Sequence, residues 1–278
     1  MITVRCLVDN SVQHSTTLWG EHGVAFLVET GDGRLLFDTG QSGTVLIHNA
    51  KEMDVDLGRV DALAISHAHL DHTGGLASFL EVCRPDLPLY ASEDIFRPRY
   101  TQLKEENRSI GMSISQEELS KHLALHLSVA PTEMLPGVWT TGEIFHRTEF
   151  EGRSPRHGII VDGKWQPDPY QDDFSLVVET SQGLVVICGC CHAGLLNTLE
   201  HIKRLFVGDI LAIFGGTHLV SATPEMLATA VERLTTLGSQ GAPRLYLNHC
   251  TGEGAFLFLS QALGQRVKSC PAGTVVTF

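Results

Sequence analysis

The run His67-Ala68-His69-Leu70-Asp71-His72 constrains this chain most, because it places three imidazoles and a carboxylate within six residues. The apolar segment 62–66 before it predicts a strand, and Thr73-Gly74-Gly75 after it lets the chain turn into a helix. Side chains alternate along an extended chain, so positions 67, 69 and 71 point one way and His72 points the other way unless the chain turns there. Ligands that point in two directions suit two adjacent cations better than one. We therefore predict a metal centre here rather than a solvated polar loop.

Residues of metal-ligand types also follow four other predicted strands, 34–37, 184–188, 210–214 and 244–248. In chain order, these strands lead to Asp38, to Cys190-Cys191-His192, to His218 and to His249. Layered α/β proteins build their sites at the carboxyl ends of strands. Asp38 can bind a metal directly, or it can accept a hydrogen bond from a metal-bound imidazole. The 14 histidines of the chain agree with metal chemistry.

The length of 278 residues and the 43% hydrophobic content predict a folded chain with a large core. We expect a single domain over 1–278, with 92–173 as an insertion or lid that binds substrate. The remaining strands are expected at the N-terminus and at 24–29, 87–91, 175–180 and 274–278, and helices at 76–83, 116–123, 195–206 and 225–237.

The composition also disfavours several classes of partner. With 32 acidic against 20 basic residues, the net charge of −12 argues against nucleic acid as a partner. No run of 18 apolar residues predicts a membrane span, and the N-terminus has no signal-peptide pattern, so we expect a cytoplasmic protein that acts on a small molecule. The seven cysteines are an odd number and are interpreted as reduced thiols, one or two of them available to a metal.

The His67–His72 motif, together with Asp38-Thr39-Gly40, resembles the metallo-β-lactamase fold superfamily. Within it, the chain is most similar to the dihydropterin-methyl-ribofuranosyl-aminobenzene-phosphate synthase group, which includes many bacterial metal-dependent hydrolases. The similarity covers nearly the whole chain, and the matching segments are 7–10, 21–23, 36–40, 66–76, 136–144, 189–194, 215–219 and 249–252.

The resemblance implies an α/β fold, a four-layer αββα sandwich, with two divalent metal ions and a bridging water or hydroxide at the strand edge. It implies that His67 and His69 hold one metal, that Asp71, His72 and a late histidine hold the other, and that Asp38 supports the cluster. We favour His249 as the late ligand and His218 as an acid or substrate-binding group. Zinc is favoured, with iron or manganese as alternatives.

Two motifs depart from the superfamily pattern. The customary histidine before the second hairpin strand is missing, and Asp172-Asp173 stand near its place. The customary bridging aspartate is replaced by Gly189-Cys190. Cys190 or His192 is therefore expected to substitute as a ligand, with Asp172 or Asp173 as a candidate to close the first site. One metal, or one tight and one loose metal, remains an alternative to two tight ones, and Cys188 and Cys191 are expected to pack as small hydrophobic residues.

These residues predict a hydrolase that uses a metal-bound water on a small, phosphorylated or cyclic substrate, with Asp71 orienting the water. A synthase that joins a pterin alkyl diphosphate to a ribofuranosyl aminobenzene phosphate is the alternative. A non-catalytic metal sensor or electron-transfer partner is a third interpretation, and the presence of Asp71 beside the histidines argues against it. His22, Arg147 and Arg156 are candidate substrate-binding residues. The remaining histidines singled out, expected at the surface, are His14, His48, His122, His157 and His201.

Overall fold

The computed structural model describes residues 1–104, 106–148, 151–239 and 241–278. Two seven-stranded sheets face each other in this part of the chain. The first has the order β18 (Val275–Thr277), β1 (Thr3–Val8), β2 (Ala25–Glu29), β3 (Arg34–Phe37), β4 (Ala62–Ala64), β5 (Leu87–Ala91) and β8 (Leu123–Leu127). From β3 to β8 neighbouring strands run parallel, so their carboxyl ends meet at one edge.

The second sheet has the order β17 (Val267–Ser269), β16 (Arg244–Leu247), β15 (Ile210–Gly215), β14 (Gly183–Cys188), β13 (Ser175–Thr180), β10 (Val138–Thr140) and β9 (Glu133–Leu135). Strands β14 to β17 run parallel, and the other pairs run antiparallel. The carboxyl ends of β14, β15 and β16 are therefore the second source of site residues.

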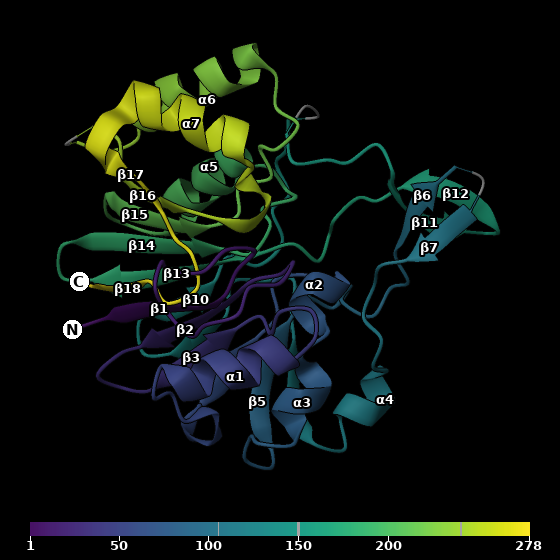
Figure 1. The fold of residues 1–278 in the computed structure, drawn as a ribbon. Helices are drawn as coiled ribbons and strands as arrows, with labels where there is room; N and C mark the ends of the chain where they lie inside the picture. Colours follow the sequence, from purple (N-terminus) through teal and green to yellow (C-terminus); the bar gives the residue numbers. More distant parts are fainter. Residues whose placement is uncertain (105, 149–150, 240) are drawn as a thin grey trace.

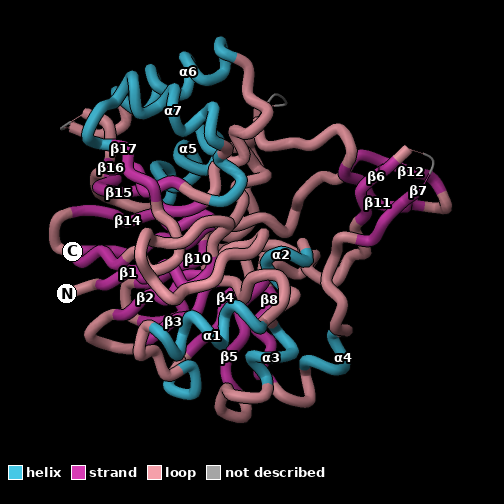
Figure 2. The backbone as a smooth tube through the Cα atoms, viewed as in Figure 1, coloured by secondary structure: helices cyan, strands magenta, loops and turns pink. Residues whose placement is uncertain are grey.

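Helices cover the outer faces of both sheets, as Figures 1 and 2 show. The α-helices are α1 (Thr44–Glu52), α2 (Leu70–Thr73), α3 (Leu76–Leu80), α4 (Gln116–Leu119), α5 (Leu195–Leu205), α6 (Pro224–Thr235) and α7 (Glu253–Leu263). The short 3₁₀ helices are η1 (Leu57–Arg59), η2 (His249–Thr251) and η3 (Gly264–Arg266). No helix within the described ranges is long and apolar enough to cross a membrane.

The hydrophobic core has three parts, which follow from side-chain alternation along the strands. Phe37 points between the sheets, where it packs with Phe26 and Phe174 among others. Its neighbour Leu36 points outward into the cluster beneath α1 and α3. A third cluster fills the space between the second sheet and helices α5 to α7. The αββα sandwich is thus confirmed.

The range 92–173 contains more regular structure than expected, and within it residues 105 and 149–150 lie outside the described residues. Strands β8, β9 and β10 belong to the two main sheets. A separate four-stranded sheet, with the order β12 (Lys164–Pro167), β11 (His157–Val161), β6 (Tyr100–Leu103) and β7 (Glu106–Ser109), projects from the body (Figure 1). The part of 92–173 that stands apart from the two main sheets is therefore this projecting sheet.

Candidate metal centre

Three buried histidines, His67, His69 and His192, form the first ligand group. The first two follow β4 and the third follows β14, so the two sheets contribute together. The ring nitrogens that they offer lie within 4.8 Å of one another. His67 Nε2 and His69 Nε2 are buried and have no hydrogen-bond partner among the described residues. Burial lowers the pKa of all three histidines well below the ordinary value, which keeps them in the neutral form that binds metals.

A second ligand group, Asp71, His72, Cys190 and His249, lies beside the first. Asp71 Oδ2 is 3.2 Å from His249 Nε2, and His72 Nε2 is 3.2 Å from Cys190 Sγ. Helix α2 begins at Leu70, so the chain turns after His69, and His72 joins a different group from His67 and His69. The rings of His67 and His72 are 4.2 Å apart, which makes the two groups neighbours.

The charged residues of the second group shift one another's pKa values toward the ionised forms. Burial alone would lower the pKa of His72, but the carboxylates of Asp38 and Asp71 raise it to about 9. Burial would raise the pKa of Asp71, but His72 and His249 hold it well below its ordinary value. The group therefore contains a carboxylate that stays ionised, as a cation ligand must.

Asp38 lies behind His72 rather than in any ligand group found among the described residues. Its Oδ2 is 2.7 Å from His72 Nδ1 and accepts a hydrogen bond from Ser66 Oγ, while its Oδ1 accepts one from the Ser66 backbone. Gly189 allows this packing, since a Cβ there would lie 2.2 Å from Ser66 Oγ. Of the two roles considered for Asp38, the geometry favours anchoring the imidazole over direct ligation.

Asp172 and Asp173 hold the ligand loops and do not belong to any of the ligand groups in the described part of the chain. Asp172 Oδ2 accepts a 2.7 Å hydrogen bond from the backbone N–H of Ala68, between two of the histidines. Asp173 Oδ2 accepts a 2.8 Å bond from the N–H of Ala193, next to His192. The expectation that one of these aspartates closes the first site is therefore corrected: His192 completes that group.

A buried arginine supports this arrangement from the base of the projecting sheet. Arg99, fully buried, pairs with Asp172 at 2.7 Å, with Asp94 at 2.7 Å and with Asp168 at 3.2 Å. Burying a charge is costly unless it is paired, and three carboxylates supply the pairing. Arg99 thereby links the projecting segment to the loop that carries His67 and His69.

A third group, Cys190, His218 and Cys250, shares one sulfur with the second. Cys250 was not predicted from the sequence, although it lies next to His249. Burial and the neighbouring Cys250 raise the pKa of Cys190, whereas the nearby Cys190 and His218 outweigh burial and lower the pKa of Cys250. The predicted packing role of Cys188 and Cys191 is confirmed, since both lie in the core beneath α5.

Unusual backbone conformations gather at this centre. Positive φ angles occur at Asp38 (62°), Cys191 (61°), His218 (49°) and His249 (48°), a region that residues other than glycine adopt at a cost of order 1–3 kcal/mol. Such strain persists where the surrounding packing fixes it, and it clusters at functional sites.

The candidate substrate-binding residues have different surroundings. His22 is largely exposed, with Nε2 at 3.3 Å from Asp71 Oδ2, at the edge of the second group. Arg156 is exposed at the base of the projecting sheet. Arg147 donates to the backbone carbonyls of Ile144, Pro169 and Tyr170. This geometry gives Arg147 a bracing role in place of the substrate contact that we expected.

Two histidines expected at the surface lie elsewhere. His157 begins β11, its ring is 5.0 Å from that of His69, and its Nδ1 is 3.0 Å from the Tyr170 hydroxyl. His201 is buried on α5 and contacts the Thr141 carbonyl. Sequence spacing gave no signal for His157, because a separate sheet brings it to the centre.

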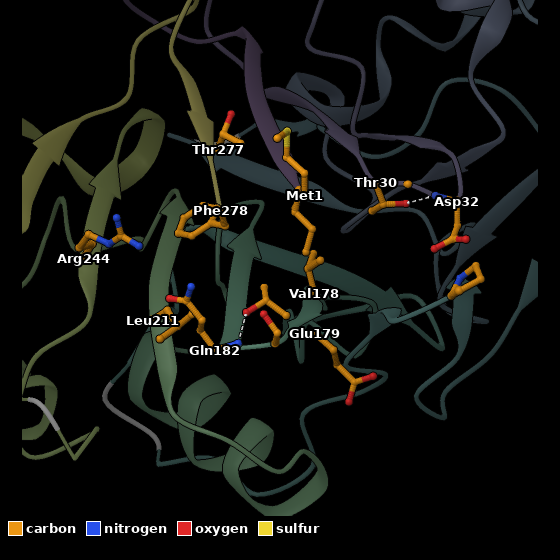
Figure 3. A pocket seen from close by; sticks show the side chains of 15 residues that line it. Met1, Thr30, Asp32, Val178, Glu179, Gln182, Leu211, Arg244, Thr277 and Phe278 are labelled. Carbon is orange, nitrogen blue, oxygen red and sulfur yellow. Dashed lines mark hydrogen bonds between the residues drawn. The ribbon is translucent and has the colours of Figure 1, made fainter.

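A hollow with a volume of about 610 Å³ lies far from these groups, and Figure 3 shows its lining. It is lined by the β2–β3 and β13–β14 turns together with Arg244 and Phe278. The β2–β3 turn is at the start of β3, whereas Asp38 follows its end. The β13–β14 turn is likewise at the start of β14, whereas Cys190 follows its end. The hollow is therefore not part of the metal centre.

The comparison with known families agrees with this architecture. The sequence profile of the metallo-beta-lactamase superfamily matches residues 18–236. The chain belongs to the metallo-beta-lactamase superfamily. Seven of the nine residues in the three groups, from His67 to His218, lie within the matched range, whereas His249 and Cys250 lie beyond it.

Two relatives from Methanocaldococcus jannaschii match along nearly their whole length. One, named 7,8-dihydropterin-6-methyl-4-(beta-D-ribofuranosyl)-aminobenzene-5'-phosphate synthase, is 27% identical over 100% of this chain and 97% of its own. The other, an uncharacterized protein, is 29% identical over 93% of this chain and 94% of its own. A solved structure titled a metal-dependent hydrolase of the beta-lactamase superfamily has a TM-score of 0.85 and 26% identity, with 100% of this chain and 99% of that chain covered.

Proposed function

We propose that this chain is a metal-dependent hydrolase that acts on a small, phosphorylated or cyclic substrate. The observation that carries the proposal is the contiguity of two different ligand groups, one of three neutral imidazoles and one that includes a carboxylate and a thiol. The buried ring nitrogens of His67 and His69, which have no hydrogen-bond partner in the described part of the chain, fit a cation, and zinc suits a set of nitrogen and sulfur donors. Divalent ions bound there would supply Lewis acidity and would neutralise charge on a phosphoryl or carbonyl group.

Other side chains at the centre would orient water, contact the substrate and hold the ligand loops. Asp71 keeps an ionised carboxylate in the second group, where it can hold a cation and orient a water molecule. His22, which lies 3.3 Å from Asp71, and Arg156, which is exposed at the base of the projecting sheet, are candidates to contact an anionic substrate. The Asp172 and Asp173 carboxylates hold the two ligand loops at a fixed separation, which reduces reorganisation during the reaction.

A synthase is the second candidate, and the name of the full-length relative favours it. In this alternative the same cations would neutralise a diphosphate leaving group, and an aromatic acceptor in place of water would form the new bond. The net charge of −12 makes a nucleic-acid substrate the less favoured choice in either case.

The metal-loaded protein should be assayed in water enriched in oxygen-18. We would supply phosphomonoesters, cyclic phosphodiesters and diphosphates singly, and then the pterin alkyl diphosphate together with the ribofuranosyl aminobenzene phosphate. Label in the product of a single substrate supports hydrolysis. Release of diphosphate only when both partners are present, with no label in the coupled product, supports the synthase and overturns the hydrolase. Full metal loading without turnover of any of these compounds would favour the sensor interpretation.

A further inference from the structure

The thiol of Cys250 belongs to neither of the first two ligand groups, yet polar groups from other loops lie close to it on several sides. The backbone N–H of His218 lies 3.3 Å from Cys250 Sγ, and the sulfur lies 3.3 Å from the Cys190 carbonyl oxygen. Gly216 leaves the space that the sulfur occupies, since a Cβ at this position would lie 2.5 Å from it. Three separate loops therefore enclose this thiol, after β14, after β15 and after β16.

An unpartnered nitrogen lies in the same group. The side chain of His218 offers a ligand atom within 4.8 Å of the sulfurs of Cys190 and Cys250. His218 Nδ1 is buried and has no hydrogen-bond partner among the described residues. Its backbone is in the left-handed region, with φ at 49°, and its ring is 4.3 Å from that of His192. A buried polar atom without a partner is costly, and a cation would satisfy it.

We propose that Cys190, His218 and Cys250 form a third cation site, which is rich in sulfur and shares Cys190 as a bridging thiolate with the second ligand group. Two sulfurs and one imidazole nitrogen are the donor set of a soft or borderline ion such as zinc or cadmium. Three protein ligands leave one tetrahedral position open. In this site His218 is a metal ligand, which replaces the acid role that the sequence suggested.

The chemistry of the third site differs from that of its neighbours. The first group offers nitrogen alone, and the second offers nitrogen, oxygen and the shared sulfur. The third is the only one of the groups in the described ranges that contains two sulfurs. A soft cation should therefore prefer the third site, and a thiolate-specific probe can distinguish this site from the other two.

Cadmium is the probe, because its thiolate complexes absorb in the ultraviolet through sulfur-to-metal charge transfer. We would load the whole chain with cadmium, count the bound ions per chain by native mass spectrometry and record the charge-transfer band. The wild-type protein should bind about three ions. Cys250→Ser should bind about one ion fewer and lose about two thirds of the band, since the bridging Cys190 makes two of the three cadmium–sulfur bonds and only one of them remains. Cys83→Ser, which removes a cysteine in the turn after α3, is the matched control and should change neither reading.

Binding of only about two ions by the wild-type protein, or a full charge-transfer band in Cys250→Ser, would overturn the proposal. If circular dichroism shows that Cys250→Ser does not fold, the wild-type protein decides the question. Cys250 should then resist alkylation when cadmium is bound and react after a chelator removes it, as mapped by mass spectrometry. Equal reactivity in both states would also overturn the site. Neither reading depends on turnover, so failure of the hydrolase proposal would leave this test intact.

Discussion

Asp38→Asn tests whether the second ligand group depends on the residue behind it. Asp38 is fully buried, and its Oδ2 lies 2.7 Å from His72 Nδ1. The carboxylate accepts a hydrogen bond from Nδ1–H, so Nε2 is the nitrogen that faces Cys190 and would bind a cation. Asparagine has nearly the same shape, but its amide either donates to Nδ1 or leaves it with a weaker acceptor. In the first case the proton moves to Nε2, and the ring can no longer bind a metal there.

The expected size of the effect follows from the contact that is lost. A hydrogen bond to a charged group contributes about 1.5–3 kcal/mol, and here both partners are buried. Loss of a residue that orients a metal ligand typically costs about 10–100-fold in metal affinity. That loss corresponds to about 1.4–2.7 kcal/mol, so the two magnitudes agree. The asparagine oxygen can still accept from the Ser66 backbone, so we expect the fold to persist.

The assay is a competition titration with a chromophoric zinc chelator, which resolves strong and weak binding events. In Asp38→Asn one event should weaken about 10–100-fold, while the event assigned to the three-histidine group keeps its affinity. Asp209→Asn is the matched control. Asp209 lies just before β15, at the end of that strand that is far from the metal centre, and its carboxylate accepts a hydrogen bond from the Ser239 backbone N–H. Unchanged zinc affinity in Asp38→Asn would refute the anchoring role, and equal weakening of all events would show that the whole site had collapsed.

Three further predictions concern the ligands themselves. His67→Ala combined with His69→Ala should lose the metal of the first group in elemental analysis, and full metal content would contradict that assignment. Asp71→Asn should abolish turnover of any identified substrate while circular dichroism stays unchanged, because an amide is a poor anionic ligand; unchanged turnover would rule out its role. Cys190 should resist alkylating reagents until a chelator strips the metal, whereas Cys188 should resist them until the protein unfolds. Protection of Cys190 that does not depend on the chelator would remove it from the site.

The sequence predicted the strands of this fold better than its helices. Strands β3, β5 and β13 have the predicted bounds, and Gly31-Asp32-Gly33 before β3 and Gly183 after β13 mark the turns at two of them. Helix α6 was found through its cap: Thr223 accepts from the Met226 N–H, and Pro224 stands at the first position. Helices α1 and α7 were missed: each begins after a glycine that offers no side-chain cap, although α5 begins in the same way after Gly194 and was predicted from its periodicity.

One expected helix ended early for a reason that only tertiary structure supplies. The range 116–123 begins with a capped turn, in which Ser115 accepts from the Glu118 N–H. Helix α4 nevertheless stops at Leu119, and Leu123 begins β8, which pairs with β5 at the end of the first sheet. Local periodicity could not reveal that this segment extends a sheet formed by strands far away in the chain.

At the metal centre, the sequence pointed to residues that follow strands and missed those that distant elements deliver. The motif 67–72, Asp38 and His249 could be found because each follows an apolar strand. Cys250 lay one residue beyond such an end, and nothing local distinguished a site thiol from a buried one. His157 comes from the projecting sheet, so its place beside His69 depends on how that sheet is attached.

The pair Asp172-Asp173 shows why residue type alone could not assign roles here. Adjacent carboxylates near a missing histidine are reasonable ligand candidates, because oxygen donors bind the same ions. In the structure, however, the two side chains diverge, and each accepts a backbone N–H from a different ligand loop. Burial raises the pKa of Asp172 to about 6 and that of Asp173 to about 7, although Arg99 and Arg147 respectively oppose the rise. Their function is to set the distance between the His67–His69 loop and His192, and that depends on the sandwich that brings β4 and β14 together.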